Sequence, residues 1–149
     1  MRIAPDGSRS RAWGNTVVGL RNPVAPPLQV HHSSEGRAWA DFTLGAAYEG
    51  PPGLVHGGVS ALILDQLLGE AAGAGGKPGM TGTLTLRYRR GTPLGDLHAE
   101  AAIDRVEGIK TLAIGSISDT DGTTVEAEGV FILPRWAREA IEKQQERFE

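Results

Sequence analysis

The sequence predicts an α+β fold in which one antiparallel sheet wraps around a single long central helix. Residues 57–72 lack proline, are rich in Ala and Leu, and are apolar around nearly the whole circumference of a helix. Four strand-like runs follow this segment and are separated by turn sequences. A sheet can bury such a helix only by curling around it, and this requirement predicts the α+β arrangement.

The composition is that of one globular domain. The 149 residues are 40% hydrophobic and 22% charged, close to the averages for such proteins. A net charge of -3 with mixed signs gives no basic stripe for a phosphate backbone, so we expect no nucleic-acid partner. The absence of cysteine excludes disulfides, thiolate nucleophiles and cysteine-ligated zinc. Residues 1–11 carry no apolar leader and no later stretch is long enough to span a membrane, so we expect a cytoplasmic protein.

The segments before the helix are a poorly patterned arm, a strand and a stiff turn. Residues 1–28 contain four prolines and little periodicity, which predicts an irregular N-terminal arm. Residues 36–44 alternate weakly and indicate a strand that ends at Gly45. The loop 47–54 includes Gly-Pro-Pro-Gly, which cannot be helical. The main domain is predicted to comprise residues 29–134.

The segments after the helix predict a meander and a last helix. A glycine-rich tail ends the central helix. The four strand-like runs are Met80–Arg90, His98–Val106, Thr111–Ser118 and Thr123–Leu133. Because their connections are short, we expect consecutive runs to be antiparallel neighbours. Residues 135–149 are highly charged and follow a proline, so they predict an exposed C-terminal helix.

Asp65 is the most anomalous residue of the sequence. Helical spacing surrounds it with apolar and mostly small residues, namely Gly58, Ala61, Leu62, Leu68, Gly69 and Ala72. Burying an unpaired carboxylate is costly, so Asp65 is a candidate functional acid or base. The alternative is a structural hydrogen bond to a backbone group or a hydroxyl.

The sequence His56-Gly57-Gly58 opens the predicted helix. Two glycines at a helix start let a ligand oxygen approach backbone N–H groups, and the helix dipole favours negative charge there, as in an oxyanion hole. His56 either holds a substrate group or a loop carbonyl, or is a structural cap.

These two features are too far apart to form one site within a single chain. His56 and Asp65 are nine positions apart, about 13 Å along a helix. Two copies related by a two-fold axis, with antiparallel helices, would bring Gly57 of one copy near Asp65 of the other. The sequence therefore predicts two equivalent sites in a homodimer.

The stretch Gly50 to Asp65, together with Met80-Thr81 and residues 86–94 (LRYRRGTPL), closely resembles the PaaI-like hotdog thioesterases, some of which act on long-chain acyl-CoA. The resemblance runs from about Gly36 through Pro134. It implies a hotdog fold and hydrolysis of an acyl-CoA substrate to the free acid and CoA. Whether two of the predicted homodimers join into a tetramer stays open. The resemblance implies no cofactor and no metal.

The resemblance also implies a role for each site residue. Asp65 would be the general base or nucleophile, and the N–H of Gly57 or Gly58 would polarise the thioester carbonyl. His56 would line that end of the site, and Thr81 of the same subunit as Asp65 would position the carboxylate or the water. Simple strand alternation places Thr81 on the face of Thr83, Thr85 and Arg87, opposite Leu84, Leu86 and Tyr88.

Basic residues near the strand ends are candidates for binding the CoA moiety. Guanidinium groups suit phosphate geometry, and the candidates for its phosphates are Arg89, Arg90 and Lys110, with Gly108 and Ile109 allowing backbone contact. Such residues are as a rule simply solvated. Two other functions stay open: a non-catalytic acyl-CoA-binding or regulatory hotdog module, and a hotdog hydratase, whose Asp–His motif is not found. The sequence does not predict the acyl group.

Overall fold

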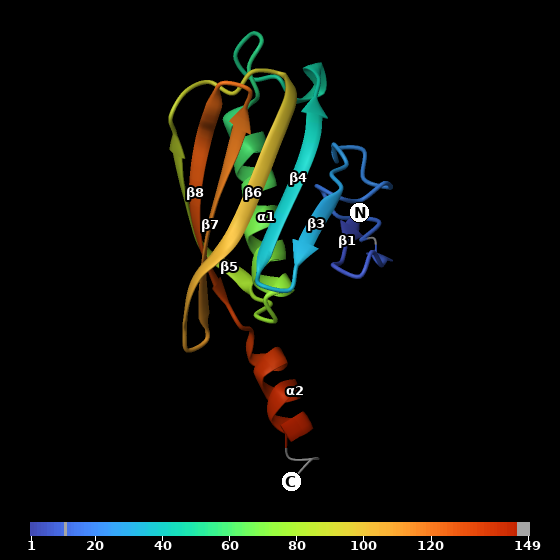
Figure 1. Cartoon of the computed structure of the whole chain (residues 1–149), viewed down its shortest axis with the longest axis vertical. Coiled ribbons are helices and arrows are strands. Elements are labelled where there is room, and N and C mark those ends of the chain that lie inside the picture. Colours follow the sequence, from blue (N-terminus) through green and yellow to red (C-terminus); the bar gives the residue numbers. More distant parts are fainter. Residues whose placement is uncertain (11, 146–149) are drawn as a thin grey trace.

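The computed structural model describes residues 1–10 and 12–145 (Figure 1). Eight strands form one sheet in the order β2-β1-β3-β4-β6-β7-β8-β5, and every pairing except β1–β3 is antiparallel. Helix α1 (Gly57–Ala74) lies against one face of the curled sheet (Figure 1). The predicted α+β fold, with a sheet wrapped around one long helix, is confirmed. The strands are β1 (Arg2–Ile3), β2 (Arg9–Ser10), β3 (Val30–Ser33), β4 (Arg37–Leu44), β5 (Met80–Tyr88), β6 (Gly95–Glu107), β7 (Lys110–Asp119) and β8 (Gly122–Ile132), and a 3-10 turn, η1, covers Ala46–Tyr48.

The core is built from large side chains on the helix and small ones on the sheet. Helix α1 buries Ile63, Leu64, Leu67 and Leu68 completely. The strands opposite contribute a set of buried alanines: Ala38, Ala40, Ala99, Ala101, Ala113 and Ala127. A Cβ added at Gly129 would lie 3.1 Å from the Leu68 side chain. Small residues on the sheet therefore let the bulky helix sit close to it, at the dense packing of a protein interior.

The predicted order of the strands is wrong at one place. Strand β5 does not neighbour β6: it pairs with β8 at the edge of the sheet, and β6 pairs with β4. Six residues, 89–94, make the crossing. Three strand spacings are about 14 Å, and six extended residues reach about 20 Å, so a short loop suffices. The Val55 N–H donates to the Thr92 carbonyl (2.8 Å) and holds the crossing in place.

Residues 1–10 and 12–28 pack against the body of the molecule beside β3 (Figure 1). Apart from β1 and β2 they have little regular secondary structure. They still contribute to the core, because Val17, Val18 and Leu28 are buried. Asn15 Oδ1 accepts hydrogen bonds from the backbone N–H groups of Val17 (2.8 Å) and Val18 (3.0 Å) and so shapes this segment.

Helix α2 (Arg135–Gln145) extends away from the sheet and buries none of its described residues (Figure 1). The predicted helix over 135–149 therefore begins as expected, and its last residues, 146–149, lie outside the described part of the chain. Within residues 1–10 and 12–145, neither helix combines the length and the apolar character needed to cross a membrane.

Candidate active site

Asp65 and Thr81 meet at the open side of α1. The Thr81 hydroxyl donates to Asp65 Oδ1 at 2.8 Å. The Asp65 side chain is half-buried rather than enclosed in apolar surroundings, because its side of the helix faces a pocket of about 540 Å³. Asp65 is therefore not an unpaired carboxylate in an apolar environment, and the alternative of a hydrogen bond to a hydroxyl is present in the structure. One oxygen of Asp65 is held by Thr81, and the pocket lies beside the same carboxylate.

A β-bulge at Gly82 directs Thr81 toward α1. Thr81 of β5 pairs with Phe131 of β8, and Thr83 pairs with Val130. Because Phe131 and Val130 are adjacent in β8, Gly82 is an extra residue in β5 without a partner of its own. The extra residue reverses the alternation at this point. Thr81 consequently shares the helix-facing side of the strand with Leu84. The placement of Thr81 by simple alternation was wrong because a bulge adds one residue to the count.

His56 caps the start of α1. Its Nδ1 accepts a hydrogen bond from the Gly58 N–H at 2.9 Å, so the structural-cap alternative for His56 describes this protomer. The Gly58 N–H is thereby engaged. Within residues 1–10 and 12–145, no hydrogen bond involves the Gly57 N–H. Gly57 is thus the glycine of the pair whose N–H is open to a ligand oxygen at the positive end of the helix dipole.

Tyr88 supports the same helix start and was missed by the sequence reasoning. Its hydroxyl donates to the Gly57 carbonyl at 2.7 Å. The signal was available, because strand alternation already places Tyr88 on the same face as Leu84 and Leu86, which pack against the core.

The two halves of the candidate site are separated within one protomer. Gly57 and Asp65 are eight positions apart on α1, a rise of about 12 Å. Strand β5 runs along the same interval, since Thr81 contacts Asp65 at one end and Tyr88 contacts Gly57 at the other. Thr81 and Asp65 therefore lie at one height along the helix axis, and Tyr88 and Gly57 lie at another.

The carboxylate of α1 that is truly buried is Glu70, whose side chain is 5% exposed. Its Oε1 accepts from Arg2 Nε (2.6 Å) and Gln66 Nε2 (2.7 Å), and its Oε2 lies 2.7 Å from His32 Nε2. Burial alone would raise the pKa of Glu70, but the hydrogen bonds from His32, Arg2 and Gln66 outweigh it and lower the pKa below its usual value. Glu70, Arg2 and His32 line the same pocket as Asp65.

The predicted CoA-binding residues fall into two separate groups. Arg89 pairs with Glu126 at 2.6 Å, and Arg90 pairs with Asp119, whose pKa is lowered to about 2 chiefly by that hydrogen bond. Gly108, Ile109 and Lys110 lie at the turn between β6 and β7. Lys110, at the start of β7, pairs with Ile132 of β8. The Arg89 N–H donates to the carbonyl of Thr124, which is eight positions earlier on β8. Eight residues of strand, about 27 Å, thus separate the two groups within one protomer.

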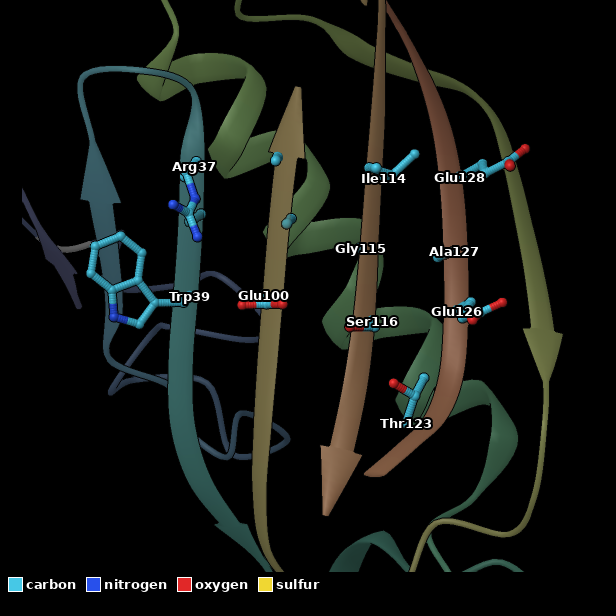
Figure 2. A pocket seen from close by; sticks show the side chains of 13 residues that line it. Arg37, Trp39, Glu100, Ile114, Gly115, Ser116, Thr123, Glu126, Ala127 and Glu128 are labelled. Carbon is cyan, nitrogen blue, oxygen red and sulfur yellow. The ribbon is translucent and has the colours of Figure 1, made fainter. Parts of the chain in front are cut away.

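A second hollow, of about 400 Å³, lies on the face of the sheet opposite α1 (Figure 2). Figure 2 shows the side chains of Glu100, Glu126 and Glu128 on this outer face. The residues that line it include none of the predicted catalytic residues. We therefore assign the candidate active site to the pocket beside Asp65.

The chain also matches a known family of proteins. The family model described as the thioesterase superfamily matches residues 52–128. The Bos taurus protein named acyl-coenzyme A thioesterase THEM4 is 32% identical over 104 residues, which are 68% of this chain and 43% of that protein. The chain thus spans about half the length of the curated relatives it matches.

Solved structures share the fold. One crystal structure of a thioesterase superfamily protein is 43% identical, with a TM-score of 0.78, covering 81% of this chain and 61% of the other. The E. coli PaaI protein from the phenylacetic acid degradation operon is 19% identical, with a TM-score of 0.61, covering 67% of this chain and 75% of the other. The predicted resemblance to PaaI-like proteins is confirmed, and the chain belongs to the thioesterase superfamily and has its hotdog fold.

Proposed function

We propose that this protein is an acyl-CoA thioesterase whose catalytic carboxylate is Asp65. The observation that carries the proposal is the Thr81–Asp65 hydrogen bond of 2.8 Å at the pocket beside α1. A carboxylate fixed through one oxygen keeps the other for a water molecule or a substrate carbon. Such an arrangement suits general-base or nucleophilic catalysis.

The active unit is a dimer formed through β5. In the described chain β5 pairs only with β8, so its other edge is open, and Met80 and Tyr88 on it are 64% and 54% exposed. An open edge is a ready partner for a second strand. Antiparallel pairing of β5 with its own copy about a two-fold axis at Thr85, with Gly82 as the extra residue of the bulge, sets Thr81 opposite Tyr88 of the second copy.

This pairing completes the catalytic site across the interface. Thr81 marks the level of Asp65, and Tyr88 marks the level of Gly57. Two copies paired in this register therefore bring Asp65 of one to the level of the Gly57 N–H of the other. Two equivalent sites result, each with a carboxylate from one protomer and an oxyanion donor from its partner.

The reaction follows from this geometry. The thioester carbonyl oxygen accepts from the Gly57 N–H, and the Gly58 N–H becomes a second donor when the His56 ring turns away. Asp65 either takes a proton from a water that attacks the carbonyl carbon, or attacks that carbon itself to form an anhydride that water then opens. In both routes the C–S bond breaks, and the CoA thiolate leaves and takes up a proton.

The same pairing brings the two groups of basic residues to one end of the dimer. Lys110 of one protomer and Arg89 of its partner then lie about three strand spacings apart, roughly 14 Å. We assign the CoA phosphates to this region. Binding there exchanges the Arg89–Glu126 pair for a phosphate contact, an exchange that costs little because exposed ion pairs contribute little.

The decisive experiment compares two Asp→Asn variants in a thiol-trapping assay with a panel of acyl-CoAs. Asp65→Asn removes the base while keeping the size of the side chain, and turnover should fall by about 10²–10⁴-fold. Asp96→Asn is the matched control, because Asp96 also accepts a hydrogen bond from a threonine hydroxyl, that of Thr43 at 2.5 Å, but this pair is exposed on the surface. Wild-type turnover by the Asp65→Asn protein would rule the mechanism out. Saturable binding by the unmodified protein without any thiol release would favour the non-catalytic binding module instead.

A further inference from the structure

The pocket beside Asp65 has an unusual charged end. Glu70 lies five residues beyond Asp65 on α1, about 7.5 Å farther along the axis. It is held by Arg2 from β1 and by His32 from β3. All three side chains line the pocket. A hollow that only accommodated an alkyl chain would not require three ionisable groups at one end, because each must be stripped of water.

Residues of the N-terminal arm and its neighbouring strand fix this charged end to the helix. Asn15 Nδ2 donates to Gln66 Oε1 at 3.0 Å, and Gln66 Nε2 donates to Glu70 Oε1 at 2.7 Å. Arg2 Nε donates to the same oxygen at 2.6 Å. Gln66 is the chain neighbour of Asp65, so one continuous hydrogen-bonded network holds the polar end of the pocket at a set distance from the catalytic carboxylate.

Arg2 still has donors available after this anchoring. Its contact with Glu70 uses Nε. For the residues that the structure describes, no hydrogen bond involves either Nη of Arg2, and the side chain is 33% exposed. The remaining donors form a planar fork that matches two oxygen acceptors, a carboxylate above all. Arg2 is therefore oriented by Glu70 and half-open to the pocket.

Several of the other residues that line the pocket are small. Gly69, Gly73, Ala74 and Gly79 border the pocket, together with Phe131. An extended acyl chain can run along such a surface without displacing side chains. The axial distance of about 7.5 Å between Asp65 and Glu70 corresponds to an acyl chain of about six carbons.

We infer that Arg2, oriented by Glu70 and His32, recognises an oxygen acceptor at the far end of the acyl group. This inference rests on the proposed thioesterase function and names its substrate class: short acyl-CoAs, about six carbons long, that carry a carboxylate, or less strongly a hydroxyl, at the end opposite the thioester. A plain alkyl chain of the same length leaves the Arg2 donors facing a methyl group, which a polar site disfavours.

The test compares three substrates of equal chain length. Hexanoyl-CoA ends in a methyl group, 6-hydroxyhexanoyl-CoA in a hydroxyl and adipoyl-CoA in a carboxylate. We expect kcat/KM to be at least about tenfold higher for adipoyl-CoA than for hexanoyl-CoA, with the hydroxyl compound between them. Equal or faster hydrolysis of hexanoyl-CoA than of both oxygenated substrates overturns the inference.

Substitution of Arg2 assigns the preference to its guanidinium group. Arg2→Met keeps most of the apolar stem and should lower the adipoyl-to-hexanoyl ratio of kcat/KM about tenfold. A ratio is used because loss of folded protein affects both substrates alike. Arg9→Met, on the neighbouring strand β2 and outside the pocket, is the control and should keep the wild-type ratio. An unchanged ratio in Arg2→Met contradicts the inference.

Two further measurements separate this inference from folding and from turnover. Glu70→Gln keeps Arg2 but weakens its anchor, and it should also lower the ratio, whereas a ratio equal to wild type contradicts the role of Glu70. Calorimetric binding of adipoyl-CoA and hexanoyl-CoA to the Asp65→Asn protein tests recognition without hydrolysis. Tighter binding of adipoyl-CoA supports the polar subsite even if the wild-type protein proves not to be a hydrolase, and equal binding of the two overturns it.

Discussion

Gly82 determines where the Thr81 hydroxyl points. As the extra residue of a β-bulge, it moves Thr81 to the side of β5 that faces α1, within 2.8 Å of Asp65. A side chain at Gly82 would meet the end of Ile132 at 2.8 Å, so a larger residue there requires that flexible side chain to shift. The sequence shows the glycine but not the register of the neighbouring strand, and the bulge depends on both.

Replacing Thr81 by valine should lower kcat about 10- to 100-fold, which corresponds to the loss of one hydrogen bond to a charged group. KM should change little, since the hydroxyl contacts Asp65 and not the substrate. Thr81→Ser retains the hydroxyl and should recover most of the rate, and steady-state kinetics on any accepted acyl-CoA provide the measurement.

Thr83→Val is the matched control for this change, because Thr83 lies on the same strand but on its other face. It should leave kcat at the wild-type value. Equal kcat values for Thr81→Val and the wild-type protein would refute a positioning role for Thr81.

The residues of the candidate site could be proposed from the sequence only where a local pattern marks them. Asp65, His56 and Gly57 stand out because a polar or glycine residue interrupts an apolar helix pattern that the sequence alone reveals. The residues of the Glu70 network do not stand out in the sequence, since Arg2 lies 68 residues away from Glu70 and His32 lies 38 residues away. A single sequence gives no means to pair such distant residues.

Among the elements, α1 and β5 were predicted with different success. The helix ends only two residues later than its composition indicated, at Ala74 instead of Ala72, because propensity and the glycine-rich tail act locally. The position of β5 beside β8 was wrong, since a six-residue loop permits both a hairpin and a crossing. The choice depends on how the whole sheet closes around the helix.

The junction between the N-terminal arm and α1 should weaken in acid. Because the pKa of Glu70 is lowered from its usual value of 4.5 in the folded protein, its stabilisation is fully present above pH 4.5 and is lost as the pH falls through the lower, folded-state pKa. Glu70→Gln should therefore reduce the free energy of unfolding by about 1–3 kcal/mol at neutral pH.

The difference in melting temperature between wild-type and Glu70→Gln proteins should shrink as the pH decreases below 4.5. Glu128→Gln, at an exposed position of β8, serves as the control and should melt with the wild-type protein throughout. A difference in melting temperature that stays constant from pH 7 to pH 3 would show that Glu70 does not stabilise through its charge.

At the scale of the whole molecule, the open edge of β5 is the surface through which the proposed dimer would complete each site. The two levels marked by Thr81 and Tyr88 lie at opposite ends of a strand that has a single partner in the described chain. In the proposed dimer, pairing of this strand with its own copy joins the two halves of each site. Activity and dimerisation should therefore be lost together.

Thr85→Asp tests this coupling. Thr85 is exposed and lies at the proposed two-fold axis, so the new carboxylate would face its own copy, and like charges directly opposite each other are unfavourable. We expect a monomer in light scattering and a fall in kcat/KM of at least about tenfold. Thr123→Asp, at an exposed position of β8, should remain dimeric and active. A fully active monomer would contradict the shared site.

The free edge of β5 has another consequence for the protein in solution. A protomer separated from its partner offers nine residues of backbone to any strand it meets, and such edges nucleate aggregates. In the proposed dimer this edge is paired with its own copy and is not available to other strands. Dilution or partial denaturation would therefore lead to irreversible aggregation more readily than to a stable monomer.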